Sequence, residues 1–174
     1  MNRKKKIAQR VVNKVVSQEI NRGKTGFKNN IEFRIEENTA SPVSEKTVLI
    51  TTYDLNKSES DHIGFMEVEG FDESFLKNID ACKKDLESLK NKVTPTNPLP
   101  IFAAYTVHLE EEYRGRGIGS SLYKKAIDHI RRSGSFFFIP WECVARGGTS
   151  EDARKVWLSL NTKYITEGSV IFID

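Results

Sequence analysis

Cysteines and long apolar runs are both scarce in this sequence of 174 residues. Cys82 and Cys143 are the only cysteines, and neither belongs to a CxxC pair or a Cys/His cluster. This excludes the usual zinc-ligand spacings, and we expect two reduced thiols in a cytoplasmic protein. No apolar run approaches the roughly 20 residues that a membrane helix needs, so we expect no membrane contact. The polar stretch at 7–10 excludes the apolar segment of a secretory signal.

What is present is ordinary for one globular domain. Hydrophobic residues make up 38% of the chain and charged residues 29%, enough for one sizeable core. The formal net charge of +3 is too small to indicate nucleic-acid binding by itself.

The positive charge is concentrated at the N-terminus. Residues 1–28 are rich in lysine and arginine and contain Glu19 as their single acid. Ile7, Val11 and Val15 recur at helical spacing. We therefore expect a basic amphipathic N-terminal helix over 1–28 that docks on the domain through its apolar face. The alternative is a contact with an anionic partner such as RNA or DNA.

Residues 29–174 are expected to form a single α/β domain. Alternation and β-branched residues predict three strands at Ile31–Ile35, Thr47–Tyr53 and Ile63–Val68. Apolar residues spaced by threes and fours from Phe71 to Val93 then predict a long helix beginning near Asp72. It forms a helical insertion at about 71–94, ended by the prolines that follow.

The second half alternates strands and helices. Ile101–Leu109 is nearly continuous in apolar residues and predicts a central, buried strand. The elements expected after it are a helix at Ile118–Arg132, a strand at Phe136–Val144 interrupted by Pro140, a helix at Ser150–Leu160 and a strand at Ser169–Ile173. This order describes one domain of the mixed α/β (α+β) class.

A glycine-rich turn joins the central strand directly to the next helix. It reads Arg114-Gly115-Arg116-Gly117-Ile118-Gly119. Glycines let backbone N–H groups approach an anion, and a helix N-terminus adds unpaired donors. No Gly-Lys-Ser/Thr follows, which excludes a P-loop, and the spacing does not fit the dinucleotide fingerprint.

The turn resembles the acyl-coenzyme A site of the general N-acetyltransferase (GNAT) superfamily, whose signature is Arg/Gln-x-x-Gly-x-Gly/Ala. Arg114, Gly117 and Gly119 occupy the specified positions. The resemblance implies a mostly antiparallel central sheet flanked by helices, with the fourth and fifth strands splayed apart. It also implies acetyl-CoA as co-substrate without a metal. The coenzyme contacts that it implies are Val107, His108, Leu109, Arg114, Gly115, Arg116, Gly117, Ile118, Gly119 and Ser120.

The same resemblance directs the search for catalytic groups. Glu142, on the expected fifth strand and inside a hydrophobic run, is our first candidate for the base, because desolvation would raise the pKa of its carboxyl group. Glu110, at the mouth of the fourth strand, is the second. In the family, a helix with the motif Asn-x-x-Ala-x-x-x-Tyr carries a tyrosine that protonates the departing thiolate. Trp157 stands at the position of that tyrosine in this sequence. Tryptophan cannot supply that proton, and Tyr164 and Tyr105 are the substitutes.

The acceptor stays open at this point. The resemblance implies N-acetyl transfer to a primary amine on a small molecule, a protein or an RNA-linked amino acid. A homodimer also stays open. The alternative function is a catalytically silent domain that binds acyl-CoA, a protein or nucleic acid.

Overall fold

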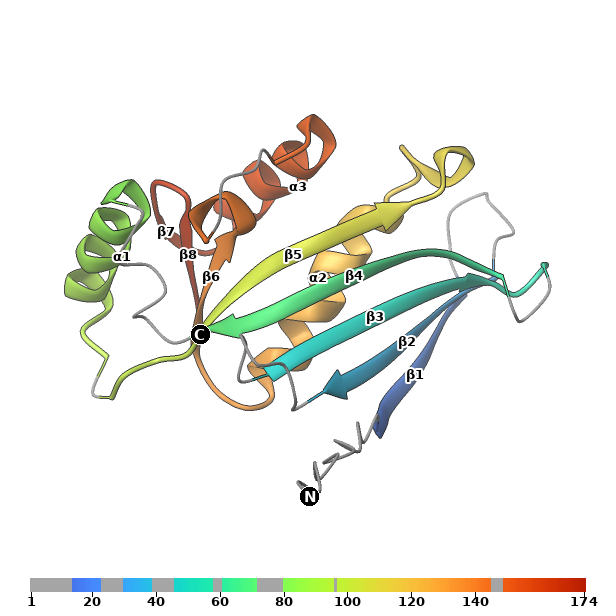
Figure 1. Ribbon diagram of the computed structural model, residues 1–174, viewed down its shortest axis with the longest axis horizontal. Helices are drawn as coiled ribbons and strands as arrows, with labels where there is room; N and C mark the ends of the chain where they lie inside the picture. The colour runs from blue at the N-terminus through green and yellow to red at the C-terminus, as the bar shows by residue number, and fades with distance from the viewer. Residues whose placement is uncertain are drawn as a thin grey trace, which may run out of the picture.

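The computed structural model describes residues 14–22, 30–38, 46–57, 61–71, 80–95, 97–144 and 149–174. They contain one sheet with the strand order β1-β2-β3-β4-β5-β6-β8-β7 (Figure 1). The strands are β1 (Lys14–Arg22), β2 (Asn30–Asn38), β3 (Lys46–Asp54), β4 (His62–Phe71), β5 (Ile101–Leu109), β6 (Phe136–Pro140), β7 (Ile165–Glu167) and β8 (Val170–Ile173). All neighbours are antiparallel except β5 and β6, which are parallel.

Three α-helices and two short 3₁₀ turns accompany the sheet within the described residues. They are α1 (Asp80–Val93), η2 (Glu111–Tyr113), α2 (Ile118–Arg131), η3 (Trp141–Cys143) and α3 (Glu151–Asn161). The predicted mixed, mostly antiparallel sheet flanked by helices is therefore confirmed. The predicted bounds are correct for β5 and within a residue for α2 and α3, because each carries a clear period and a cap or break.

The two faces of the sheet carry different cores. On one face α2 packs against the inward residues of β2, β3 and β4, such as Phe33, Ile50 and Met66. On the other face α1 covers one end of the sheet, where Leu86 and Leu89 pack with Ile101. The rest of that second face lies toward the viewer in Figure 1 and has no helix over it among the described elements.

The expected N-terminal helix is wrong where the structure describes it. Lys14–Arg22 form strand β1, which pairs antiparallel with β2. Valine-rich segments favour strands, and pairing with β2 satisfies backbone groups that a helix at this place would leave at a sheet edge. Residues 1–13 and 23–28 of the predicted helix lie outside the described residues.

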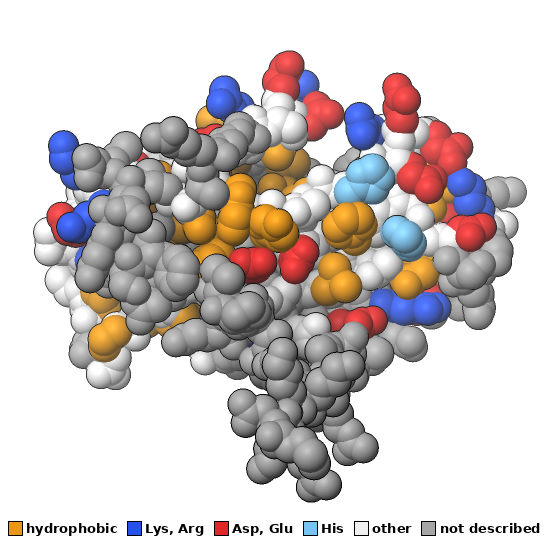
Figure 2. All heavy atoms as spheres, viewed as in Figure 1, with side chains coloured by type: hydrophobic (Ala, Val, Ile, Leu, Met, Phe, Trp, Pro, Cys, Tyr) orange, Lys and Arg blue, Asp and Glu red, His pale blue; other side chains and the backbone are white. Residues whose placement is uncertain are grey.

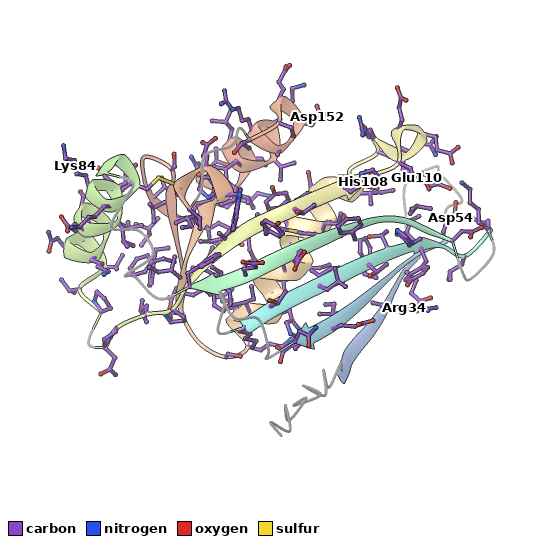
Figure 3. The ribbon with its side chains drawn as sticks, viewed as in Figure 1. Arg34, Asp54, Lys84, His108, Glu110 and Asp152 are labelled. Carbon is purple, nitrogen blue, oxygen red and sulfur yellow. A yellow bond between two sulfur atoms is a disulfide. The ribbon has the colours of Figure 1, made fainter. Side chains whose placement is uncertain are left out.

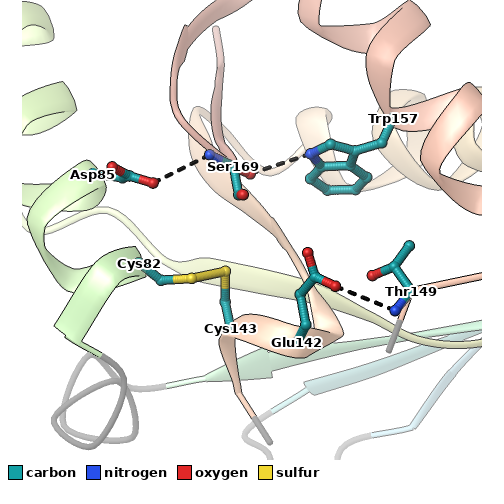
Figure 4. Close-up of a disulfide and its surroundings, with 7 residues drawn as sticks. All are labelled: Cys82, Asp85, Glu142, Cys143, Thr149, Trp157 and Ser169. Atoms are coloured by element: carbon teal, nitrogen blue, oxygen red, sulfur yellow. Dashed lines mark hydrogen bonds between the residues drawn. A yellow bond between two sulfur atoms is a disulfide. The ribbon is translucent and has the colours of Figure 1, made fainter. Parts of the chain in front are cut away.

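The expectation of two free thiols is also wrong. Cys82 on α1 and Cys143 on η3 form a disulfide, and their Cα atoms lie 5.6 Å apart (Figure 4). Both cysteines are buried in the second core. The two residues are separated by 61 positions in the sequence, so no local pattern could indicate the pairing. The inserted helix is thereby bonded to the turn that follows β6.

Two strand predictions also need correction. The strand expected through Val144 ends at Pro140, and Trp141–Cys143 is a 3₁₀ turn, because proline fixes φ and offers no N–H for a ladder. Phe71 ends strand β4 rather than opening the inserted helix, which is described from Asp80 on. Residues 72–79 lie outside the described part.

Candidate functional site

Strands β5 and β6 separate halfway along β5. Their parallel pairing runs from Ile101↔Phe137 to Ala104↔Pro140 and stops there. β5 continues to Leu109 and pairs only with β4 along this second half. Tyr105 and Val107 are correspondingly 43% and 36% exposed. The expected separation of these two strands is present, and the predicted burial holds for the first half of β5 alone.

The free half of β5 directs two amides toward the side that β6 has left. The amide of Glu110 donates to the Ile63 carbonyl of β4 over 2.9 Å. Backbone groups of an extended strand alternate in direction, so those of His108 also face β4. The amides of Val107 and Leu109 then point away from β4. Consistent with this, the Leu109 carbonyl accepts a hydrogen bond from Arg114 Nε over 3.0 Å.

The glycine-rich turn opens the N-terminus of α2 to solvent. Gly115 and Gly117 have φ values of 72° and 79°, in the left-handed region that favours glycine. Gly117 is the N-cap and makes no side-chain capping bond. A Cβ atom at Gly115, Gly117 or Gly119 would meet nothing within 4 Å. The first-turn amides of α2 therefore face open space with the positive end of the helix dipole behind them.

A buried tyrosine anchors this turn to the sheet. Tyr113 lies just before it, is 3% exposed and donates from its hydroxyl to Asp54 Oδ2 at the end of β3. Burial alone would raise the pKa of Asp54, but hydrogen bonds from the Asn56 amides and from Tyr113 outweigh it and leave that pKa lowered. Burial and the bond to Asp54 raise the pKa of Tyr113. The Asp54 carboxylate of this pair is therefore ionised at neutral pH, and the Tyr113 phenol is protonated.

These parts enclose a cavity of about 530 Å³. Its walls come from the free half of β5, the glycine-rich turn with α2, and the start of α3. The lining residues are Val107, His108, Leu109, Arg114, Gly115, Gly117, Gly119, Ser120, Tyr123, Ser150, Asp152, Ala153 and Val156. Figure 3 shows two of the lining residues, His108 on β5 and Asp152 on α3.

The predicted coenzyme residues gather here with two exceptions. Arg116 is exposed, and its guanidinium lies 5.5 Å from the centre of the Tyr113 ring. Ile118 is 7% exposed and belongs to the core under α2. The remaining eight all line the cavity.

The two predicted carboxylates lie outside the lining. Glu142 stands on η3 rather than on a strand, is half-buried, and accepts a hydrogen bond from the Thr149 amide over 3.2 Å (Figure 4). Glu110 caps η2 at the end of β5, and Lys57 Nζ lies 3.7 Å from its carboxylate. The groups in the lining that can accept a proton are His108 and Asp152.

Tyr123 is a cavity residue that the sequence reasoning missed. It is 3% exposed, and burial raises the pKa of its phenol to about 12. A signal was present, because Tyr123 follows Gly119 by four positions and so lies on the same face of α2. Trp157 has a structural role: its ring packs 5.0 Å from Phe138, and its N–H donates to the Ser169 carbonyl.

The substitutes proposed for the missing tyrosine lie apart from the cavity lining. Tyr105 packs its ring 4.4 Å from that of Trp141, and Tyr164 is a half-buried residue against the main core. Burial raises the pKa of Tyr164. Within the described ranges no three metal-binding side chains come together, and no helix there is long and apolar enough to cross a membrane.

Comparison with known proteins matches the segment that supplies most of the cavity lining. The family described as "Acetyltransferase (GNAT) family" matches residues 91–145, which include β5, the glycine-rich turn, α2 and β6. The resemblance stated from the glycine-rich turn is thus confirmed. Among solved structures the chain is similar to "AtaT complexed with acetyl-methionyl-tRNAfMet", with 16% identity over 72% of this chain and 69% of that chain and a TM-score of 0.45. Curated proteins give no match.

Proposed function

We propose that this chain, whose residues 91–145 match the acetyltransferase (GNAT) family, transfers an acetyl group from acetyl-CoA to a primary amine. The observation that carries the proposal is the junction of two features in one cavity. The free half of β5 offers unpaired amides, and the uncapped N-terminus of α2 lies directly beside it.

The residues present fit the coenzyme. A pyrophosphate needs several donors without side chains in the way, and the turn from Gly115 to Gly119 supplies them together with the cationic Arg114. In this proposal the amides of Val107 and Leu109 hold the acyl oxygen, on which negative charge develops as the amine attacks. Acetyl-CoA, when bound, supplies an activated thioester carbonyl.

The transfer needs a group that takes a proton from the amine. As the amine nitrogen bonds to the acyl carbon, the carbon–sulfur bond breaks, and one proton passes from the nitrogen to a base. We rank His108 first because it lines the cavity and stands on β5 between Val107 and Leu109, whereas the other lining candidate, Asp152, lies on α3. Glu110 and Glu142 remain proposals, the former at the mouth of β5 and the latter on η3.

The leaving sulfur has a proton donor within the cavity. The Tyr123 phenol lines the cavity and is protonated at neutral pH, as an ordinary phenol also is, so it can donate a proton to the departing thiolate. Trp157 occupies the position of the family's tyrosine and holds its own N–H in a bond to Ser169. We therefore assign proton donation to Tyr123.

Release of coenzyme A thiol from acetyl-CoA across a panel of primary amines tests the function. The wild type should release thiol with at least one amine. His108→Ala, Glu110→Gln, Glu142→Gln and Tyr123→Phe should each be compared for turnover and, separately, for acetyl-CoA affinity. Loss of the essential base should lower turnover by roughly 10²-fold or more with affinity retained. Binding without thiol release from any amine would instead support a catalytically silent domain.

A further inference from the structure

The sheet face opposite α2 presents polar and aromatic side chains beside the free half of β5. Strand alternation puts Phe65, Glu67 and Glu69 of β4 on this face, since Met66 and Val68 lie in the core under α2. Their partners across the ladder are His108, Thr106 and Ala103 of β5. We call the patch made by Phe65, Glu67, Glu69, Tyr105, Thr106 and Trp141 the open-face patch.

Aromatic rings frame the open-face patch at both ends. Trp141 packs 4.4 Å from Tyr105 and 5.7 Å from Phe71, where the second core begins. At the other end Phe65 lies 5.7 Å from His108. Figure 2, which looks onto this face, shows acidic side chains surrounded by hydrophobic ones and histidines. Tyr105 is exposed, and Phe65 and Trp141 are half-buried, so these three rings can receive the stem and the charge of a cationic side chain.

Among the described residues, the carboxylates of the patch have no cation paired with them. In the described part of the chain neither the Glu67 nor the Glu69 carboxylate takes part in a side-chain hydrogen bond or ion pair. Burial and then the neighbouring charge of Glu67 raise the pKa of Glu69. On β2, which continues the face, Glu36 adds a negative charge, and the single cation Arg34 is paired with Glu32 at 2.9 Å. The described face is therefore negative.

The patch adjoins the reaction centre of the proposed function. Thr106 lies opposite Glu67, and Val107, the next residue, lines the coenzyme cavity. A side chain lying across Glu67 and Glu69 can thus reach the free half of β5 beside His108, which lies on this face and also lines the cavity.

We propose that the open-face patch docks a basic protein segment and presents one of its lysines to the acyl group. The proposal rests on the proposed function and names its acceptor class. Charge complementarity favours this occupant, since a negative face attracts lysine and arginine and repels the phosphates of an RNA-linked acceptor. A strand face is also open and extended, unlike the concave sites that enclose small amines.

Binding and transfer should be measured on the full-length protein. The probes are a short fluorescent peptide with one lysine flanked by arginines, its counterpart flanked by glutamates, spermidine, and an aminoacyl-tRNA. Anisotropy reports peptide binding without turnover, and thiol release reports transfer. The test variant is Glu67→Gln/Glu69→Gln, and the matched control is Glu87→Gln on the exposed side of α1.

We expect the basic peptide to bind and to be acetylated in preference to the other three acceptors. The double variant should weaken peptide binding and raise the peptide KM by about tenfold or more, with acetyl-CoA affinity unchanged. The salt dependence of peptide binding should also flatten in the variant, which a merely structural effect would not produce. Glu87→Gln should behave as wild type.

The proposal is overturned if both peptides bind equally, if the double variant binds the basic peptide as the wild type does, or if spermidine or aminoacyl-tRNA is the preferred acceptor. Each of these results leaves the proposed function standing. Failure to bind acetyl-CoA would instead overturn the proposed function. The two failures can be told apart, because the anisotropy measurement of peptide binding to the patch needs no coenzyme.

Discussion

The Tyr113 hydroxyl donates a 2.9 Å hydrogen bond to Asp54 Oδ2, joining the turn before the glycine-rich loop to the end of β3. Tyr113→Phe removes this bond and leaves Asp54 buried with fewer donors, so the free energy of unfolding should fall by about 2 kcal/mol. Acetyl-CoA affinity should fall as well, because the loop loses its anchor. Denaturation and calorimetry measure the two effects. Tyr53→Phe, whose ring stays under Arg34, is the control and should change neither.

The same pair predicts how stability depends on pH. The pKa of Asp54 is lowered in the folded protein, so its ionised form contributes stability that is present above the unfolded value of about 3.8 and is lost as pH falls through the lower folded value. Asp54→Asn should be less stable at pH 7 and should lose less stability on acidification. Urea denaturation from pH 7 to pH 2 would check this. Parallel curves for both proteins would show that Asp54 does not titrate as stated.

The open N-terminus of α2 predicts a specific loss of coenzyme binding. Gly117→Asp places bulk and negative charge where the pyrophosphate would lie, and we expect acetyl-CoA affinity to fall at least tenfold, about 1.4 kcal/mol. Gly134→Asp is the matched control, since Gly134 also has positive φ and open space and lies beyond the other end of α2. Calorimetry on variants shown to be folded measures the acetyl-CoA affinity of each. Equal affinity in both variants would place the coenzyme elsewhere.

The Cys82–Cys143 disulfide should contribute measurably to stability. Closing a loop of 61 residues restricts the unfolded chain, and the chain-entropy relation gives about 4 kcal/mol. We expect reductant, or Cys82→Ser/Cys143→Ser, to lower the free energy of unfolding by an amount of that order. Denaturation with and without reductant measures it, and the double variant itself should be insensitive to reductant. Identical denaturation curves of the wild type with and without reductant would contradict the Cys82–Cys143 disulfide.

The turn between β7 and β8 is fitted closely to α1. The Asp85 carboxylate accepts from the Ser169 amide over 3.2 Å, and a Cβ atom at Gly168 would lie 2.0 Å from Asp85 Oδ2. Gly168 also has a φ of 51°, so Gly168→Ala should cost about 2 kcal/mol or more of stability. Asp85→Ala removes the obstructing oxygens, and Gly168→Ala in that background should cost only the backbone strain. A double-mutant cycle by thermal denaturation gives the difference.

The parts of the fold that the sequence predicts well are those with a strong local signal. β5, the glycine-rich turn and α2 follow one another closely in the sequence. An apolar run, a cluster of glycines and a helical period mark them in turn, and each pattern can be recognised from the sequence alone. Most of the predicted coenzyme residues line the cavity for this reason.

The wrong predictions concern residues whose secondary structure or pairing depends on contacts with distant parts of the chain. The valines near Val15 fit a helical period and a strand equally, and only the free edge of β2 selects the strand. The apolar run around Glu142 predicts a strand, but the ladder ends at Pro140 and leaves Glu142 on a 3₁₀ turn. The two cysteines meet through packing of the inserted helix, and Glu67 with Glu69 joins the aromatic residues only through strand register.

The disulfide makes residues 82–143 a covalent ring. That ring contains β5, the glycine-rich turn and α2, which supply most of the residues that line the cavity, together with β6. A protease that cut the segment between α1 and β5 would therefore open the ring without producing two separate chains. The nicked protein would keep its mass on a non-reducing gel and would separate into two fragments only after reduction. The whole phosphate-binding segment would stay attached to the sheet after such a cut.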